Sequence, residues 1–291
     1  MKKNIVAIML TLCFAVSAVA CSSKADEAPE ETAVVTEETT EEAPAEETEE
    51  ATEETSEEAT EETTEEAAEE TEAAGEVMTH DDFVAAEVDT EVTVETYVQA
   101  KQGWWEDNGV GQASIYTQAE DGAYFLYNMP CTEEEYNQLT EGTKIRVTGY
   151  KSEWEGEVEI TDAKFEILDG NFVAEAKDVT AELAADTLID SQNEFVSFKD
   201  MTVEPSTDAD GNEVAFLYNY DGSGEQGSDL YFNVSADGNT YTFTVESYLC
   251  DKDSDVYKAV EGLNVGDVVD MEGFLYWYQG VNPHITSVTV K

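Results

Sequence analysis

The chain has 291 residues, with 68 acidic and 13 basic side chains and a formal net charge of −55 at pH 7. It is too uneven in composition to be one domain, because every Trp and Tyr and nearly every Gly follows residue 75. Only residues 76–291 can bury a core, and they carry 10 basic and 45 acidic side chains, a formal charge of −35. This charge argues against a polyanionic partner.

Residues 1–20 have the pattern of a signal peptide. Lys2 and Lys3 precede an apolar stretch that is shorter than the ~20 residues a spanning helix needs. The stretch ends in Ala18, Val19, Ala20 and Cys21, which resembles the bacterial lipobox, although Ala18 stands where that motif usually has Leu. The sequence therefore predicts lipidation of Cys21 (diacylglyceryl and palmitate chains) and an extracytoplasmic protein anchored to the bacterial cell membrane. An ordinary cleaved signal with an incidental Cys is the alternative.

Residues 21–75 contain the predicted lipidated N-terminus and a tract of repeated Glu, Thr and Ala. Adjacent glutamates repel one another, and the tract has no aromatic residue and no apolar periodicity. These properties predict a disordered, extended acidic stalk. The stalk could hold the globular part at a distance from the membrane, or its only role could be to keep the protein soluble.

The globular part contains an internal repeat. Gly142 and Gly149 have the same spacing as Gly266 and Gly273, and each pair is followed by a further glycine and an Ile-Thr pair. Further matched positions are Gly156 with Gly280, Ile160 with Ile285, Asp121-Gly122 with Asp237-Gly238, and Cys131 with Cys250. The sequence therefore predicts two copies of one module.

The first copy can be divided into elements from its patterns. Residues 92–98 alternate apolar and polar side chains, as a half-buried strand does. Strands at 113–118 and 123–128 flank a hairpin signal at Asp121-Gly122. Thr132 and Glu135 form a capping box that opens a short helix, and strands at 145–147 and from residue 158 follow it. A helix between the third and fourth of five strands is the order of the OB-fold.

The run from Gly142 to Ile160, with its Trp154-Glu-Gly156 turn, resembles bacterial extracytoplasmic OB-fold domains of the nucleic-acid-binding-like (tRNA-anticodon-like) type. The resemblance implies an all-β protein with two tandem five-stranded OB-like barrels, in residues 76–170 and 171–291. Each barrel has a short helix between strands 3 and 4. The second copy departs from the first by an enlarged segment, residues 205–228, expected between its first two strands.

OB-folds bind ligands on the face of strands 2 and 3, between two loops. In the first copy these loops contain Trp104, Trp105 and Trp154, which we expect on one face. The second copy has Tyr276 and Trp277 in the matching region. These five side chains are the candidate ligand-binding residues, and packing at the barrel ends or between the copies is the alternative.

Nucleic acid is predicted to be an unlikely partner, because phosphate contacts draw on Lys and Arg. The first copy has few basic residues, with many glutamates beside them: Lys101, Lys144, Arg146, Lys151 and Lys164. Asp251, Asp253 and Asp255 have the odd spacing of a calcium loop, but a charged helix N-terminus explains them better. Weak divalent-cation binding by so acidic a surface is still expected, without a defined metal site or cofactor.

The chain has no recognisable catalytic motif, and its two histidines, His80 and His284, lack metal-ligand spacing. We therefore expect a non-enzyme: an envelope-anchored binding or scaffold module for an extracytoplasmic protein, a cationic peptide or a glycan. The alternative is an enzyme or accessory domain that handles extracellular nucleotides or oligosaccharides. Free thiols are favoured for Cys131 and Cys250, since a bridge needs Cα atoms within ~7 Å, and a bridge formed in an oxidising compartment is the alternative.

Overall fold

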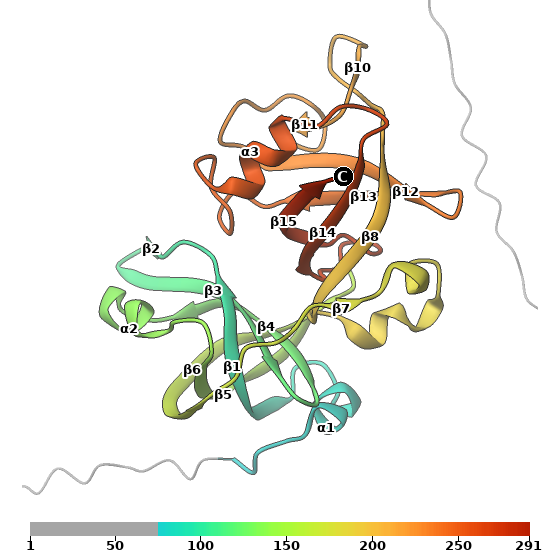
Figure 1. The fold of residues 1–291 in the computed structure, drawn as a ribbon. Helices are drawn as coiled ribbons and strands as arrows, with labels where there is room; N and C mark the ends of the chain where they lie inside the picture. The colour runs from blue at the N-terminus through green and yellow to red at the C-terminus, as the bar shows by residue number, and fades with distance from the viewer. Residues whose placement is uncertain (1–74) are drawn as a thin grey trace, which may run out of the picture. The chain divides into compact units, whose positions relative to one another are not determined.

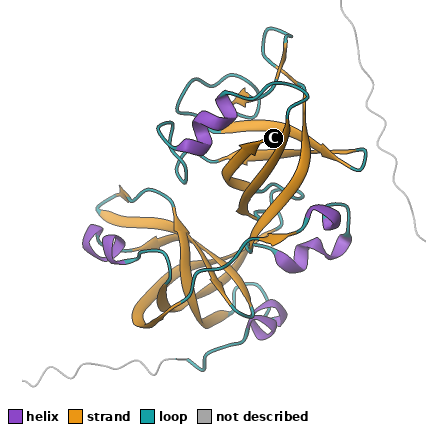
Figure 2. Cartoon of the chain, in the orientation of Figure 1, coloured by secondary structure: helices purple, strands orange, loops and turns teal. Residues whose placement is uncertain are grey.

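The computed structural model describes residues 75–291, which belong to one compact unit. Strands dominate this part of the chain, with a few short helices at its loops (Figure 2). The predicted all-β fold is therefore confirmed. The predicted signal peptide, Cys21 and the acidic stalk lie outside the described residues. Among residues 75–291, no helix has the length and apolar character needed to cross a membrane.

The N-terminal half is built from five long strands, one short edge strand and two short helices (Figure 1). In chain order these are α1 (His80–Ala85), β1 (Glu91–Lys101), β2 (Trp105–Asp107), β3 (Val110–Ala119), β4 (Gly122–Pro130), α2 (Glu133–Gln138), β5 (Thr143–Trp154) and β6 (Glu157–Asn171).

The five long strands close into a barrel. Their order is β1-β5-β6-β4-β3, and a further pairing of β1 with β3 completes the ring. Helix α2 lies in the chain between β4 and β5, the third and fourth strands of the barrel, as predicted. Thr132 and Glu135 form its capping box. The strand order and helix position are those of an OB-fold. Inward side chains such as Val94, Ile115 and Ile145 fill the barrel and are fully buried.

Helix α1 was not predicted from the sequence. Thr79 and Asp82 form a capping box at its start, and Phe83 points into the barrel core. The buried ammonium of Lys151 donates to the carbonyls of Phe83, Val84 and Ala86 at 3.0, 2.8 and 2.8 Å. Lys151 thereby satisfies the Val84 and Ala86 carbonyls at the end of the helix and adds a second donor to that of Phe83, which also accepts from the Ala86 N–H at 3.2 Å.

The hairpin between β3 and β4 differs by one residue from the sequence prediction. Ala119 pairs with Gly122, so the loop residues are Glu120 and Asp121. Gly122 makes room for a ring instead, because a Cβ atom there would lie 2.2 Å from Cγ of His80. The equivalent hairpin in the second half does use Asp237 and Gly238, both with positive φ, as its two-residue loop.

The C-terminal half repeats this plan with more insertions (Figure 1). Its elements are β7 (Lys177–Asp178), the 3-10 helices η1 (Thr180–Glu182) and η2 (Asp186–Ser191), β8 (Phe195–Glu204), β9 (Ser206–Thr207), β10 (Glu213–Val214), β11 (Leu217–Tyr218), β12 (Leu230–Ala236), β13 (Asn239–Val245), α3 (Asp255–Glu261), β14 (Val268–Phe274) and β15 (His284–Val290).

The strand pairings of this half follow the same cyclic order as the first. The sheet runs β12-β13-β15-β14-β8, and β12 also pairs with β8, while β13 and β15 share the single registered pair Thr244 and His284. The enlarged segment 205–228 lies between β8 and β12, as predicted, and contains β9, β10 and β11. Helix α3 follows Ser254 as its N-cap, which agrees with the helix-start interpretation of the nearby aspartates.

Side chains from both halves meet in a small apolar seam, which we define by Tyr116, Phe125 and Phe274. The rings of Tyr116 and Phe274 are stacked with centroids 4.3 Å apart. Beside the seam, the fully buried Glu157 accepts hydrogen bonds from the backbone N–H of Trp277 at 2.9 Å and from Gln192 at 3.2 Å. The two halves therefore share buried apolar and polar contacts.

Cys131 is buried and Cys250 is partly buried, and both are free thiols. Burial raises the pKa of each thiol to about 11. Neither thiol is therefore an activated nucleophile.

Candidate functional site

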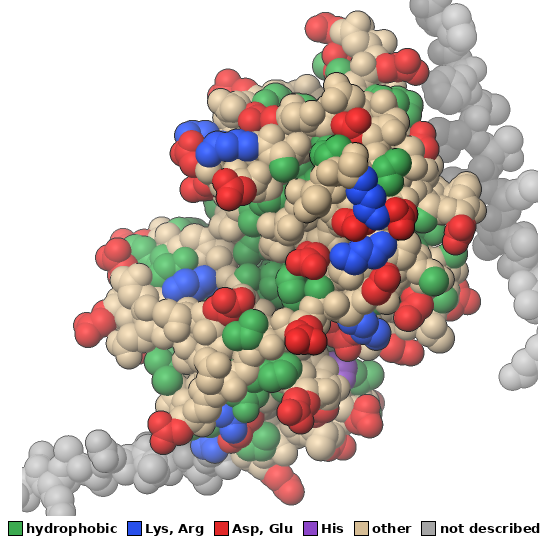
Figure 3. All heavy atoms as spheres, viewed as in Figure 1, with side chains coloured by type: hydrophobic (Ala, Val, Ile, Leu, Met, Phe, Trp, Pro, Cys, Tyr) green, Lys and Arg blue, Asp and Glu red, His purple; other side chains and the backbone are tan. Residues whose placement is uncertain are grey.

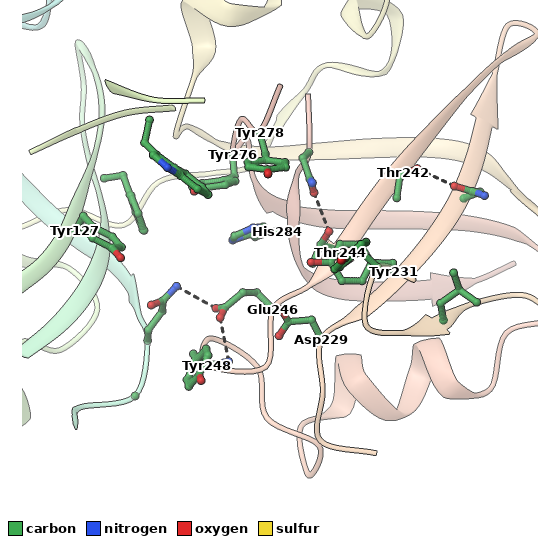
Figure 4. Close-up of a pocket in the computed structure, with 18 of the residues that line it drawn as sticks. Tyr127, Asp229, Tyr231, Thr242, Thr244, Glu246, Tyr248, Tyr276, Tyr278 and His284 are labelled. Atoms are coloured by element: carbon green, nitrogen blue, oxygen red, sulfur yellow. Dashed lines mark hydrogen bonds between the residues drawn. The ribbon is translucent and has the colours of Figure 1, made fainter. Parts of the chain in front are cut away.

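A cleft of about 1150 Å³ opens beside the seam and takes its lining from both halves. From the N-terminal half, strands β2, β4 and the last residue of β5 line it, together with the loop after β1. From the C-terminal half, strands β9, β11, β12, β13 and β15 line it, together with the segments before β12, after β13 and after β14. Figure 4 shows its central side chains. β4 and β12 are barrel strands of the face on which OB-folds bind ligands.

The walls of the cleft carry an unusual number of exposed aromatic rings. Trp105 and Trp154 are 43% and 53% exposed, and Tyr220 and Tyr248 are each 71% exposed. The full set of exposed aromatic side chains in the lining, which we call the aromatic rim, is Trp105, Tyr127, Trp154, Tyr220, Tyr248 and Tyr278. Clustered apolar surface of this kind marks an interaction site more often than scattered exposed residues do.

The structure brings only two of the three candidate tryptophans of the first copy to this cleft. Trp105 and Trp154 line it, and the Trp154 ring lies 5.1 Å from that of Tyr278. Trp104 instead packs against the barrel core, and its indole N–H donates to the carbonyl of Cys131 at 3.0 Å. The expectation that all three share one face was wrong for Trp104. A Cβ on Gly111 would lie 2.4 Å from its ring, so Gly111 leaves the space that the indole occupies.

The two candidates of the second copy are separated in the same way. Tyr276 lines the cleft and stacks on His284 with centroids 4.2 Å apart. Trp277 packs against the C-terminal core and borders a smaller pocket of about 290 Å³. Ligand binding by Trp105, Trp154 and Tyr276 stays a prediction.

One wall of the cleft contains two neighbouring carboxyl groups, Asp229 and Glu246 (Figure 4). Glu246 is only 9% exposed and accepts hydrogen bonds from Gln102 Nε2 at 3.0 Å and from the N–H of Tyr248 at 3.2 Å. Burial, with the nearby Asp229 carboxylate as the second cause, raises the pKa of Glu246 to about 7. Asp229 Oδ1 accepts from the N–H and hydroxyl of Ser247 at 2.8 and 2.6 Å.

The floor of the cleft contains His284, which is 8% exposed. Its Nδ1 lies 2.8 Å from the hydroxyl oxygen of the fully buried Tyr116. Burial lowers the pKa of His284 to about 3, so the imidazole is neutral at physiological pH. His284 therefore places a polar but uncharged side chain on the floor of the cleft.

The remaining polar lining is uncharged and consists of amides and hydroxyls such as Gln102, Asn128, Asn233 and Thr242. Among the described residues that line the cleft, none is Lys or Arg. The wider surface is acidic, and Figure 3 shows Asp and Glu side chains spread over the face in view. The cleft thus combines aromatic faces, neutral hydrogen-bonding groups and two carboxyls.

No group of three or more His, Cys, Asp or Glu side chains within residues 75–291 is arranged to hold a metal ion. Asp253 N donates to Asp251 Oδ1 at 2.9 Å, in a turn that leads into α3. Weak binding of divalent cations by the acidic surface stays a prediction.

Sequence reasoning missed most of the cleft, including Tyr127, Tyr231, Asp229, Glu246 and His284. A signal for the tyrosines was present. Tyr231 lies between the buried Leu230 and Phe232 on β12, so strand alternation turns it away from the core. No comparable signal marks His284, whose partner Tyr116 is 168 positions away in the chain.

No family model and no curated protein matches this sequence. Several solved structures are similar in fold. The structure described as a murine DNA-binding protein bound with double-stranded DNA has 9% identity and a TM-score of 0.33, over 68% of this chain and 94% of that chain. The Ifi202 HINa domain in complex with 20-bp double-stranded DNA has 11% identity and a TM-score of 0.30, over 70% and 96%. A replication protein A heterotrimer bound to single-stranded DNA has 12% identity and a TM-score of 0.29, over 69% and 49%.

These structures correct one expectation from the sequence. Nucleic acid was predicted to be an unlikely partner, whereas the similar chains are described with bound double-stranded or single-stranded DNA. The prediction used the charge of the globular part and the few Lys and Arg side chains of the first copy, both of which concern contacts with phosphates. Stacking of bases on aromatic rings depends on the faces of those rings, which neither observation takes into account.

Proposed function

We propose that residues 75–291 form a carbohydrate-binding module, whose oligosaccharide ligand lies in the cleft against the aromatic rim. The observation that carries the proposal is the presence of six exposed aromatic side chains on the walls of one cleft. A pyranose ring has an apolar C–H face that packs on an aromatic ring, and a periphery of hydroxyls that need hydrogen-bonding partners. Aromatic walls with a few well-placed polar groups are typical of small-molecule sites.

The uncharged polar side chains of the lining also support carbohydrate binding. Gln102, Asn128, Asn233 and Thr242 both donate and accept hydrogen bonds, as sugar hydroxyls do. The volume of about 1150 Å³ exceeds the ~300–1,000 Å³ of an ordinary ligand pocket, which favours an oligosaccharide over a single sugar.

Calorimetric titration with soluble oligosaccharides tests the proposal, and single-stranded oligonucleotides and cationic peptides belong in the same panel. Trp154→Ala should weaken glycan binding about tenfold, equivalent to ~1.4 kcal/mol. Tyr150→Ala is the matched control, because Tyr150 lies on the same strand, is 45% exposed and does not line the cleft. Binding of an oligonucleotide with no binding of any glycan would refute the proposal.

A second candidate function is that of an enzyme acting on oligosaccharides, which is the alternative that the sequence left open. It is favoured by two carboxyl groups in one cleft, one of them with a pKa raised to about 7. Glycoside hydrolysis uses such a pair, with the group of raised pKa as the general acid. Release of new reducing ends that stops in Glu246→Gln would support this candidate, whereas binding without turnover would support the binding module.

The proposed setting is the outside of the bacterial cell membrane, with Cys21 as the lipid anchor and residues 22–75 as the spacer. This part of the proposal is supported by the Ala-Val-Ala-Cys boundary of the sequence alone. A ligand in this setting would be an extracytoplasmic glycan.

A further inference from the structure

The two carboxyls of the cleft lie next to each other, each one residue beyond the end of a paired strand. Strands β12 and β13 are antiparallel, and their last registered pair is Leu230 with Val245. The next positions outward are Asp229 and Glu246. Since Leu230 and Val245 are buried in the core, strand alternation turns Asp229 and Glu246 towards the cleft. Like charges directly opposite each other on paired strands destabilise a sheet. A cation between the two carboxylates would remove that cost.

The hydrogen bonds of Asp229 and Glu246 leave their carboxylate oxygens able to accept further donors from the cleft. Asp229 uses Oδ1 for Ser247, and no hydrogen bond within the described residues uses its Oδ2. Glu246 takes one donor on each oxygen, and a carboxylate has room for about four. The neighbouring Tyr231 and Tyr248 add aromatic faces, which attract a cation.

The hydrogen bond between the buried Tyr116 and His284 determines which hydrogen-bonding group the floor of the cleft presents. The hydroxyl of Tyr116 is fully buried, and its hydrogen bond to Nδ1 of His284 is the only one it makes within the described residues. Its proton must therefore be donated to Nδ1, since a buried hydroxyl proton without an acceptor is costly. The neutral imidazole then carries its own proton on Nε2, for which the described residues provide no acceptor. His284 thus presents an N–H donor to the cleft.

We propose that the cleft selects amino sugars with a free, protonated amine, which Asp229 and Glu246 hold while the His284 Nε2–H donates to a ring hydroxyl oxygen. This inference rests on the proposed carbohydrate-binding function and names its ligand class. A cationic sugar has the three features that the lining complements: an apolar ring face, hydroxyls and one positive charge. The formal charge of −35 on residues 76–291 attracts the same ligand from solution.

The experiment compares two β-1,4-linked glucosamine tetramers, one fully N-acetylated and one fully deacetylated, by calorimetry on the full chain. It is run at about pH 6.5, where a sugar ammonium is largely protonated, and in about 0.15 M salt to screen surface charge. Glu246 has a pKa of about 7 in the free protein, and an ammonium bound beside it favours its ionised form. The deacetylated tetramer should bind about tenfold more tightly. Glu246→Gln and Asp229→Asn should each abolish that preference. The control is the double variant Glu120→Gln/Asp190→Asn, which removes two exposed acidic charges outside the cleft and should keep it.

The outcomes separate this inference from the proposed function. Equal binding of both tetramers, weakened by Trp154→Ala, would overturn the inference and leave the carbohydrate-binding function standing. Binding of neither tetramer would overturn the inference, and the oligosaccharide panel described above would then decide the proposed function. A preference that survives both cleft variants, or falls equally in the control, would show general charge attraction and overturn the inference. Tri-lysine binding as tightly as the deacetylated tetramer would also overturn it, since the sugar ring would then contribute nothing.

The melting temperature distinguishes a role of the two carboxyls in ligand binding from a role in stability. Replacing a carboxyl that stabilises the fold would lower the melting temperature. Above about pH 7, where the Glu246 carboxyl is ionised, Glu246→Gln removes one of two neighbouring charges, so it should melt at or above the wild-type temperature while losing the amine preference. If Glu246→Gln does not fold, Asp229→Asn carries the test, because an asparagine Oδ1 can still accept from Ser247.

Discussion

The fully buried Glu157 beside the seam should make this protein less stable as the pH rises. Its Oε2 accepts from Trp277 and Gln192, whereas its Oε1 is buried without a partner. Burial raises the pKa of Glu157 from 4.5 to about 8. Between these values the unfolded chain has lost the proton and the folded chain keeps it, so unfolding releases a proton. The stabilising contribution is therefore complete below about pH 4.5 and is lost as the pH rises through about 8.

The size of the effect follows from the interval between the two pKa values. At ~1.4 kcal/mol for each pH unit, the upper limit is ~5 kcal/mol, and relaxation of the folded state around the charge should reduce it to about 2–4 kcal/mol. Glu157→Gln keeps the shape of the protonated side chain and cannot ionise. We expect the variant to be more stable than wild type by about 2–4 kcal/mol near pH 9, and within ~1 kcal/mol of it near pH 5.

Urea unfolding followed by tryptophan fluorescence at both pH values measures this difference. The rest of the acidic surface also repels itself more strongly at high pH, so Glu120→Gln, in an exposed turn, serves as the control. A free-energy difference for Glu157→Gln that is the same at the two pH values, or no larger than that of the control, would refute the reasoning.

Three further predictions concern other parts of the chain. Lys151→Met should lower the free energy of unfolding by about 1–3 kcal/mol, because three carbonyls at the end of α1 lose their charged donor; a chemical denaturation curve measures it. Cys21→Ser should release the protein from membranes, and a membrane-bound Cys21→Ser protein with its leader uncleaved would contradict the lipid anchor. Fragments 76–170 and 171–291 should each give a β-rich circular dichroism spectrum and a cooperative melt, and failure of both would contradict the predicted boundary near residue 170.

Much of the fold could be predicted because its signals are local. The capping box of Thr132 and Glu135 specifies where α2 begins, and strand alternation at 92–98 marks β1. Gly122 is a position where the local sequence pattern predicted the wrong structural role. Its dipeptide is typical of a turn, yet its function in the fold is to accommodate the ring of His80, which comes from another element. A close approach between distant segments leaves no pattern in the residues that flank the glycine.

The site was harder to predict than the fold for the same reason. Trp104 and Trp105 are adjacent in the sequence, yet one is buried beside Gly111 and the other faces the cleft. Which of two adjacent side chains points inward depends on the register of β2 against β3, and composition does not specify that register. Asp229 and Glu246 meet only because β12 and β13 pair, so their proximity belongs to the sheet.

The construction of the cleft from both halves has a mechanical consequence. Gln102 on one side of the cleft and Glu246 on the other are 144 positions apart in the chain and are joined by one hydrogen bond. A ligand that touches both walls adds contacts that must rupture before the halves can be pulled apart. Occupancy should therefore appear as a higher rupture force in single-molecule pulling between residue 75 and the C-terminus. For a protein tethered at one end and loaded at the other, ligand binding would raise tensile strength.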